Sequence, residues 1–281
     1  MFITGVRGPD GNGQWSGGFA DVFRASYKGK WVALKRLRDY VEKETVETIR
    51  LKFCREALVW KNLDHPNVLR LIGIDRDTFS PSLCMVLPWM GQGKIQDHLK
   101  IFGKQNVQKL LCDVAQGLQY LHSYHIVHGD LRGACDNILI TNNWTACLSD
   151  FGLSMFTNLS ERIPTGGGNL RWMAPELIQP ELYGHSDSEF KPTFQSDIYA
   201  FGCVCVELYT GEPPFSAVKT DTALIGRVPQ GERPDRPTGQ SSMSDTLWQY
   251  VNTYWAHQPE SRPNAQTVVE HFTGLIAGGA N

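Results

Sequence analysis

The sequence has no long hydrophobic run and no large excess of charge of either sign. No apolar stretch approaches the roughly 18–20 residues that a transmembrane helix requires, so the sequence predicts no insertion into a membrane. The formal net charge of −2 gives no indication of a nucleic acid as partner. The opening MFITGVRGPDG is too short and too interrupted by glycine to be a secretory signal. Together these absences favour a soluble intracellular protein of the cytoplasm.

The sequence also lacks the pairs of Cys-x-x-Cys units that bind structural zinc, although it contains seven cysteines. The number is odd, and most of the cysteines lie within apolar segments. We therefore expect most of them to be buried free thiols in a reducing compartment. Cys135 differs because it lies in a polar loop between two motifs, but a redox role for it is the less favoured interpretation.

The first third of the chain has the alternating pattern of β-strands. Residues 19–35 carry β-branched and aromatic side chains on both sides of a Lys-Gly-Lys turn, which predicts a β-hairpin. Residues 68–73 and 83–87 predict two further strands. Residues 46–63 place an apolar side chain at every third or fourth position, which predicts a helix. A small β-rich part with one helix therefore covers residues 1–90.

The rest of the chain, residues 91–281, has the longer period of helices. Residues 107–122 carry apolar side chains on one face, whereas residues 197–209 are apolar nearly all round. A helix of the second kind has to be buried in the middle of a folded unit. Residues 245–276 predict two or three shorter helices. We therefore expect an α+β protein with two lobes and a ligand cleft between them.

The segment of residues 128–152 carries three polar residues with different chemical uses. Asp130, Asn137 and Asp150 lie on short loops around the apolar run Ile138-Leu139-Ile140, which predicts a buried strand. One carboxylate is suited to orient or deprotonate a hydroxyl group. The amide and the second carboxylate are suited to hold a hard cation that prefers oxygen ligands.

This order, aspartate, asparagine and then Asp150-Phe151-Gly152, resembles the active-site segment of the protein kinases. Other motifs of that family follow in the expected order over residues 15–275. The segment RWMAPE ends at Glu176 and resembles the part of a kinase that closes the substrate platform, with Arg262 as the structural partner of Glu176. The combination is most similar to the tyrosine-kinase-like group, whose members mostly phosphorylate serine or threonine.

The resemblance implies that residues 1–281 form one kinase domain with an N-lobe over residues 1–90 and a C-lobe over residues 91–281. It implies ATP and Mg²⁺ as the cofactors and a protein as the substrate. Asp197, at the start of the predicted buried helix, is expected to bond the backbone of the catalytic loop. The alternative interpretation of Asp197 is a charge that only stabilises the helix terminus.

The residues at the catalytic positions of the family are Lys35, Glu56, Asp130 and Arg132. Glu56 follows Lys35 by 21 residues and lies on the apolar stripe of the predicted helix, where a carboxylate is costly unless it is paired. This position favours the kinase pair that orients nucleotide phosphates over a solvated edge lysine. By the same resemblance, Asp130 orients the substrate hydroxyl and accepts its proton, and Arg132 contacts the transferring phosphate.

The resemblance also implies which residues bind the nucleotide and the metal. Asn137 and Asp150 would bind magnesium. The expected nucleotide-binding residues are Gly17, Gly18, Val22, Ala33, Lys35, Leu87, Pro88, Met90 and Leu139. Of the three family glycines, the phosphate-binding loop retains only Gly17, with Gly18 adjacent to it, because Trp15 and Ala20 stand at the other two positions. The connection between the lobes keeps the backbone carbonyl and N–H groups that would bond the adenine edge, with Leu87 limiting the back pocket.

Two departures from the family pattern bear on activity. Gly129 stands where most kinases have the arginine that pairs with a phosphorylated activation loop, so we expect no dependence on that form of switching. The amide ligand of kinases follows the catalytic aspartate by five positions, whereas Asn137 follows Asp130 by seven. The spacing from Asn137 to Asp150 is normal, so the two extra residues lie around Cys135-Asp136.

Three functions remain open on these grounds. The first is an ATP-dependent protein kinase directed at serine or threonine, with tyrosine not excluded. The second is a pseudokinase that keeps the fold, and in one form also the nucleotide, and acts as a scaffold or allosteric partner. The two extra residues and Trp15 favour the pseudokinase, whereas the presence of every charged catalytic residue favours the enzyme. A small-molecule kinase is disfavoured by the WMAPE segment and by Arg262.

Overall fold

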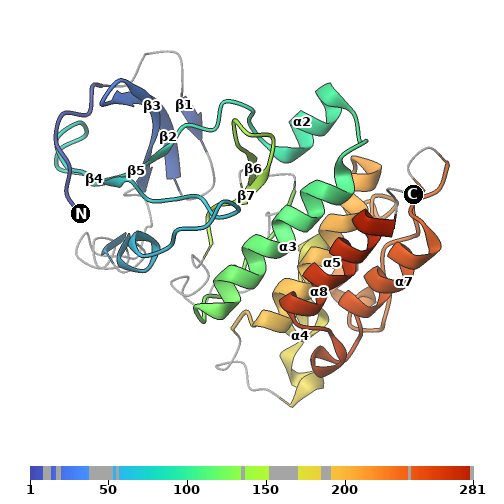
Figure 1. The fold of residues 1–281 in the computed structure, drawn as a ribbon. Coiled ribbons are helices and arrows are strands. Elements are labelled where there is room, and N and C mark those ends of the chain that lie inside the picture. The colour runs from blue at the N-terminus through green and yellow to red at the C-terminus, as the bar shows by residue number, and fades with distance from the viewer. Residues whose placement is uncertain are drawn as a thin grey trace. The chain divides into compact units, whose positions relative to one another are not determined.

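The computed structural model describes residues 1–8, 14–16, 20–37, 53–54, 57–133, 137–151, 170–184, 191–239 and 242–278. The chain divides into two compact units, Met1–Gly91 and Gln92–Asn281 (Figure 1). The first unit is built around a β-sheet and the second is mostly helical, which confirms the α+β prediction. In the described part of the chain, no helix is both long enough and apolar enough to cross a membrane.

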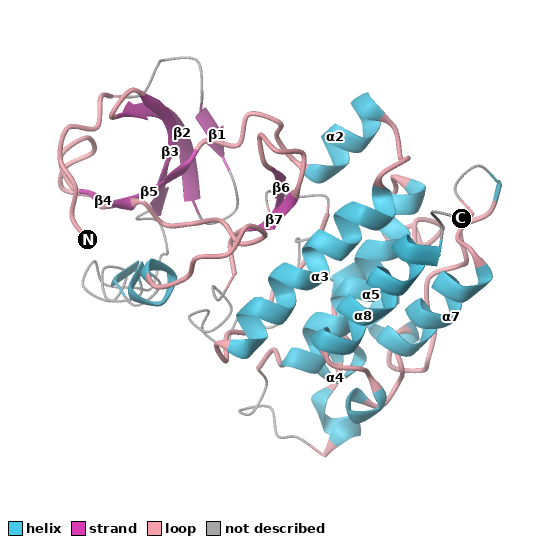
Figure 2. Cartoon of the chain, viewed as in Figure 1, coloured by secondary structure: helices cyan, strands magenta, loops and turns pink. Residues whose placement is uncertain are grey.

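Within the described residues, the first unit contains an antiparallel sheet of five strands in the order β1-β2-β3-β5-β4 (Figure 2). The strands are Gln14–Ser16 (β1), Ala20–Tyr27 (β2), Lys30–Leu37 (β3), Gly73–Asp75 (β4) and Cys84–Pro88 (β5). The predicted hairpin is formed by β2 and β3. Lys28 and Gly29 in its turn have φ angles of 49° and 74°, the left-handed values that a tight two-residue hairpin turn requires.

The strand predicted over residues 68–73 is wrong for most of its length, because β4 begins only at Gly73. Val68, Leu69 and Leu71 are buried, and the indole N–H of Trp60 donates a hydrogen bond to the carbonyl of Leu69. The apolar character of this segment therefore comes from its place in the core of the unit. The strand predicted over residues 83–87 agrees with β5 within one residue.

The helix predicted over residues 46–63 lies partly outside the described residues. Positions 53–54 and 57–61 are helical, and Phe53, Ala57 and Trp60 of the predicted apolar stripe are buried. Glu56 of the same helix is outside the described residues.

The second unit contains seven α-helices among its described residues. They are Ile95–Phe102 (α2), Val107–Ser123 (α3), Pro175–Ile178 (α4), Phe194–Thr210 (α5), Thr222–Arg227 (α6), Asp245–Tyr254 (α7) and Ala265–Gly278 (α8). Three short 3₁₀ turns are Leu170–Trp172 (η3), Pro180–Tyr183 (η4) and Pro259–Ser261 (η7). A two-stranded antiparallel ladder pairs Ile138–Ile140 (β6) with Ala146–Leu148 (β7).

Helix α5 is the centre of the second unit, as its apolar sequence predicts. Every side chain from Ser196 to Tyr209 is buried. Thr193 begins the helix with a capping box, in which its hydroxyl oxygen accepts a hydrogen bond from the backbone N–H of Ser196. Gly211 ends it with a φ of 81°, a left-handed conformation that glycine adopts at low cost.

Helices α3 and α8 pack side by side, and α3 also contacts α5 (Figure 1). The apolar face predicted for residues 107–122 is buried throughout: Val107, Leu110, Leu111, Val114, Leu118 and Leu121. The amphipathic pattern of α3 is therefore explained by its position against these neighbours. The helices predicted over residues 245–276 are α7 and α8, with η7 between them.

Candidate functional site

Lys35 is buried on strand β3, with only 2% of its surface exposed. This burial excludes the alternative of an edge lysine in water. Its ammonium group lies 5.8 Å from the centre of the Trp60 ring, and Lys35 takes part in further interactions. A buried ammonium group is costly unless anions or dipoles compensate it. Glu56 lies outside the described residues, so its pairing with Lys35 stays a prediction.

Four of the predicted nucleotide-binding residues lie on one face of the sheet. Val32, Leu34 and Val86 point into the apolar core of the other face. Because side chains alternate along a strand, Ala33, Lys35 and Leu87 point to the opposite face.

Val22 joins that face, because it lies directly across from Lys35 in the ladder of β2 and β3. Ala33 lies across from Leu87 in the same way. Pro88 ends β5 and Met90 follows two residues later, both half-buried. Gly17 and Gly18 are outside the described residues, and their role stays a prediction.

Arg24 is a residue of this face that the sequence pattern did not single out. It lies two positions after Val22 on β2, and its guanidinium group lies 4.6 Å from the ring centre of Trp31 and 5.8 Å from that of Trp89. The sequence could have indicated this position, because side chains two residues apart on a strand point to the same face, as Val22 and Arg24 do. The result is a cation–π cluster beside the segment that contains Pro88.

In the second unit, Asp197 holds the backbone of the loop that carries Asp130. Its carboxylate accepts hydrogen bonds from the backbone N–H groups of His128 and Gly129, each at 2.8 Å. The carboxylate also lies 2.9 Å from Nε2 of His122 on helix α3. The prediction that Asp197 bonds this backbone is confirmed. Gly129 has a φ of 78°, so the position favours glycine on conformational grounds as well.

Asp130, Arg132 and Asn137 are brought together despite the unusual spacing of the loop. Oδ2 of Asp130 accepts hydrogen bonds from the guanidinium group of Arg132 and from the side-chain amide of Asn137, both at 2.9 Å. The same amide nitrogen donates to the backbone carbonyl of Asp130. The two extra residues therefore do not separate Asn137 from Asp130. Cys135 and Asp136 themselves lie outside the described residues.

Asn137 and Asp150 flank the same end of the β6–β7 ladder, Asn137 directly before β6 and Asp150 two residues after β7. Ile138 lies opposite Leu148, and the backbone N–H of Ser149 donates to the carbonyl of Asn137 at 2.9 Å, which extends the ladder by one pair. Asp150 follows with a φ of 56°, a conformation that a non-glycine residue keeps only where its surroundings impose it. Leu139 lies in the middle of β6, half-buried.

The donor set of this end suits a hard cation such as magnesium, because it consists of an amide and a carboxylate. Among the described residues, no group of three or more histidine, cysteine, aspartate or glutamate side chains is placed to bind a metal ion.

His128 is a fully buried ring beside Asp130. Burial lowers the pKa of His128, against the opposing attraction of Asp197, Asp130 and Asp150. Its Nδ1 accepts a hydrogen bond from the backbone N–H of Asp130 at 3.3 Å. The ring meets that of Phe151 edge to face, with 6.4 Å between the centres. The two motifs that carry Asp130 and Asp150 are therefore in contact through a buried aromatic pair.

Comparison with known proteins agrees with this geometry. The family model described as protein tyrosine and serine/threonine kinase matches residues 14–272. The chain belongs to the protein kinase family. It is 32% identical over 92% of its length to the serine/threonine-protein kinase STY17 of Arabidopsis thaliana, and 29% identical over 92% to the serine/threonine/tyrosine-protein kinase HT1 of the same plant. It is 31% identical over 91% to mitogen-activated protein kinase kinase kinase A of Dictyostelium discoideum. The chain spans 43%, 64% and 26% of the lengths of these relatives.

The segment expected to form the substrate platform is anchored by a buried ion pair. Both carboxylate oxygens of Glu176 accept hydrogen bonds from the guanidinium group of Arg262, at 2.6 and 2.8 Å. The side chain of Arg262 is fully buried. The predicted pairing is confirmed, and its bidentate form fixes helix α4 against the turn that precedes α8.

Arg171, in the same platform, is a second anchor that the sequence pattern did not identify. Its guanidinium group donates to the carboxylate of Asp221 at 2.9 Å and to the backbone carbonyls of Pro214, Phe215 and Val218 at 2.8–3.0 Å. These bonds hold η3 to the segment before α6. The available signal was a long polar side chain directly before the WMAPE segment.

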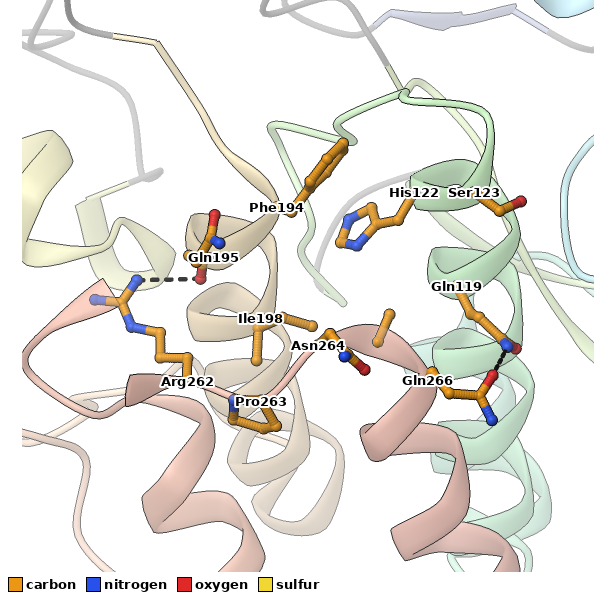
Figure 3. A pocket seen from close by; sticks show the side chains of 11 residues that line it. Gln119, His122, Ser123, Phe194, Gln195, Ile198, Arg262, Pro263, Asn264 and Gln266 are labelled. Carbon is orange, nitrogen blue, oxygen red and sulfur yellow. Dashed lines mark hydrogen bonds between the residues drawn. The ribbon is translucent and has the colours of Figure 1, made fainter. Parts of the chain in front are cut away.

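A pocket of about 380 Å³ lies elsewhere in the helical unit, between the end of α3 and the starts of α5 and α8 (Figure 3). His122 and Phe194 line it beside a hydrogen-bonded pair, Gln119 and Gln266. None of the residues expected to bind nucleotide, metal or substrate lines this pocket.

Proposed function

We propose that the chain is a catalytically active kinase domain that transfers the γ-phosphate of ATP to serine or threonine hydroxyls of a protein substrate. The observation that carries the proposal is the contact of Asn137 and Arg132 with Asp130. A degenerate catalytic loop has no requirement to keep these three side chains together. The names of the relatives support serine and threonine, and one of them adds tyrosine.

Asp130 is the residue that handles the substrate hydroxyl. Two hydrogen bonds to Oδ2 and the bonds of Asp197 to the loop backbone fix the direction of its carboxylate. The substrate oxygen forms a bond to the γ-phosphorus, the bond from that phosphorus to the bridging oxygen of ADP breaks, and the hydroxyl proton passes to Asp130. Positioning and charge stabilisation account for most of the rate in such a reaction.

Arg132 and Lys35 supply positive charge to the phosphates. The guanidinium group of Arg132 lies against Asp130, and this position supports our proposal that Arg132 contacts the transferring group. Lys35 is held on β3 for the nucleotide phosphates. Asn137 and Asp150 would hold Mg²⁺, which neutralises phosphate charge when bound.

Gly129 leaves the kinase without the arginine that usually pairs with a phosphorylated activation loop. We propose that activity does not require that pairing. We also propose an intracellular location, which is supported by the free thiols of the six cysteines in the described residues. Detection of the chain only in a secreted fraction would contradict the location.

The test is phosphate transfer from Mg²⁺-ATP to generic protein substrates, with the wild type and Asp130→Asn compared side by side. We expect transfer by the wild type and a loss on the order of 100-fold or more in the variant. Equal transfer by both proteins would reject the role of Asp130. No transfer by either, together with a thermal shift on adding ATP and Mg²⁺, would favour the nucleotide-binding pseudokinase.

A further inference from the structure

A cation–π cluster lies at one end of the sheet face on which the nucleotide is expected to bind, and the proposed mechanism does not use it. Its members are Arg24, Trp31 and Trp89. The guanidinium group of Arg24 lies 4.6 Å from the ring centre of Trp31 and 5.8 Å from that of Trp89. Of all side chains, tryptophan attracts a cation most strongly in this way. The cluster therefore joins β2, β3 and the segment that follows β5.

The register of the sheet places this cluster beside the expected adenine site. Arg24 lies directly across from Ala33, and Ala33 lies across from Leu87. Both Ala33 and Leu87 are expected to contact the nucleotide. Trp31 comes two residues before Ala33 and Trp89 two residues after Leu87, so the alternation of side chains puts both indole rings on the same face. The cluster is therefore the next row of side chains beyond the row of Ala33.

Trp89 also sets the direction of the backbone groups on either side of it. Its N–H donates a hydrogen bond to the carbonyl of Trp31 at 3.3 Å, toward β3. Because the peptide bond is planar and trans, the carbonyl of Pro88 points the opposite way. Where the chain stays extended, the N–H of Met90 points to that edge as well. These are the two groups expected to bond the adenine edge, and they come after residues 84–86, where β5 pairs with β4.

We propose that Arg24 is a positioning residue for adenine, which acts by holding the side chain of Trp89 against β3. The inference rests on the proposed function, because it uses the adenine contacts expected of Pro88 and Met90. The guanidinium group holds the indole of Trp89, and the carbonyl of Trp31 holds its N–H. Together they oppose rotation of this segment about its own axis, so its adenine-facing groups keep their direction before the nucleotide arrives. Such preorganisation strengthens binding.

The charge of Arg24 is needed for this role, which separates it from simple packing. A methionine at this position fills much of the same space but has no charge, so it loses the attraction to both indole rings. A lysine keeps the charge as a compact ammonium group without the planar guanidinium, and it retains part of the attraction. The two substitutions therefore distinguish the cation–π contact from the volume of the side chain.

The experiment measures the Kd values of ADP and GDP, each with Mg²⁺, by isothermal titration calorimetry of the full chain and its variants. For Arg24→Met we expect the Kd of ADP to rise about fivefold to tenfold. Guanine has a carbonyl where adenine has an amino group, so it does not fit the same backbone groups. We therefore expect the Kd of GDP to change by less than about twofold and the preference for ADP to fall. A general loss of structure would raise both Kd values alike and would contradict the proposal.

Lys28→Met is the matched control, because it removes a cation that lies over an aromatic ring at the tip of the same hairpin. The ammonium group of Lys28 lies 5.1 Å from the ring centre of Tyr27. We expect the Kd of ADP in this control to stay within about twofold of the wild type, and in Arg24→Lys within about threefold. Wild-type affinity for ADP in Arg24→Met, or an equal loss in Lys28→Met, would overturn the proposal.

A double variant tests whether Arg24 acts through Trp89. We expect Trp89→Leu alone to raise the Kd of ADP by a factor similar to that of Arg24→Met. Two residues that act as one unit do not add their effects, so Arg24→Met combined with Trp89→Leu should bind ADP no more weakly than the weaker single variant. Additive losses would show that Arg24 affects the nucleotide by another route, and they would overturn the proposal.

These binding measurements do not require phosphate transfer, so the two proposals can fail separately. A chain that binds ADP with the expected differences but transfers no phosphate would contradict the proposed function and support the role of Arg24. A wild type with no affinity for ADP would overturn the role of Arg24. In an active chain, Arg24→Met should raise the KM for ATP about fivefold to tenfold and leave kcat and the peptide KM within about twofold. A lower kcat with an unchanged KM for ATP would refute the assignment.

Discussion

Breaking the buried ion pair of Glu176 and Arg262 is expected to destabilise the helical unit strongly. Arg262→Met removes a guanidinium group that is fully buried and leaves Glu176 as an unpaired carboxylate with a side chain only 7% exposed. Removing one partner of a buried pair costs about 3–5 kcal/mol of unfolding free energy. Arg262 also donates to the carbonyls of Ala256 and Gln195, at 2.9 and 3.1 Å, so we expect the upper part of that range.

The assay is thermal unfolding followed by circular dichroism, supported by urea titration. For a domain of this size, 1 kcal/mol corresponds to roughly 2–4 °C in Tm, so we expect a decrease of about 10–15 °C. The matched control is Arg227→Met, which breaks the exposed pair of Arg227 and Glu232, separated by 3.4 Å. An exposed pair contributes about 0–1 kcal/mol, so its Tm should fall by no more than about 4 °C.

The double variant Arg262→Met with Glu176→Leu separates the two causes. Replacing both charges by apolar side chains removes the unpaired carboxylate, and such replacements are often close to neutral. We therefore expect the double variant to recover most of the lost stability. A Tm decrease below about 3 °C in Arg262→Met, or a double variant less stable than the single one, would refute the reasoning that the uncompensated charge dominates.

Three further predictions follow from the Asp130 loop. Asn137→Ala removes the amide that bonds Asp130 and that we propose as a magnesium ligand. We expect kcat to decrease on the order of 100-fold and half-maximal activity to need more Mg²⁺. Magnesium titration measures both, and an unchanged titration curve would reject the proposed ligand. Gly129→Ala places a Cβ atom on a residue in the left-handed conformation, with a φ of 78°, and should lower the unfolding free energy by about 1 kcal/mol. Urea titration measures this free energy, and an unchanged value would show that the backbone does not require glycine at this position. Burial lowers the pKa of His128, so its contribution to stability is present above its ordinary pKa of 6.5 and is lost as the pH falls below that value. Urea titrations at pH 7.5 and 5.5 should therefore show a smaller change in unfolding free energy in His128→Asn than in the wild type. An equal change in the two proteins would contradict the expectation.

The sequence predicted best those helices whose apolar residues are buried along their whole length. Helix α5 reads as buried because it is apolar all round, and the apolar face of α3 is buried at every predicted position. The strand at residues 68–73 was misplaced because a buried irregular segment and a buried strand have the same apolar composition. Burial alone does not reveal whether the backbone pairs into a sheet.

In the candidate site, too, some contacts were predicted from the sequence and others were not. The motif spacing predicted the contacts of Asp197 and the pairing of Glu176 with Arg262, because these residues have fixed places in the kinase pattern. The return of Asn137 to Asp130 did not follow from spacing, since closure of a loop with two extra residues depends on tertiary hydrogen bonds. Glu207 was overlooked although it is a carboxylate inside an apolar helix, and such a residue has to find donors.

Two buried carboxylates of α5 contact the loop on either side of Asp130. Asp197 and Glu207 are ten positions apart, about 15 Å along the helix axis. They hold the loop on each side of Asp130, and the stretch between the held points contains only Asp130, Leu131 and Arg132. We expect an insertion after Gly133 to add chain outside this stretch and to leave the position of Asp130 unchanged. An insertion of the same length beside Leu131 would add chain inside it and displace the carboxylate, so the place of an insertion in this loop matters more for activity than its length.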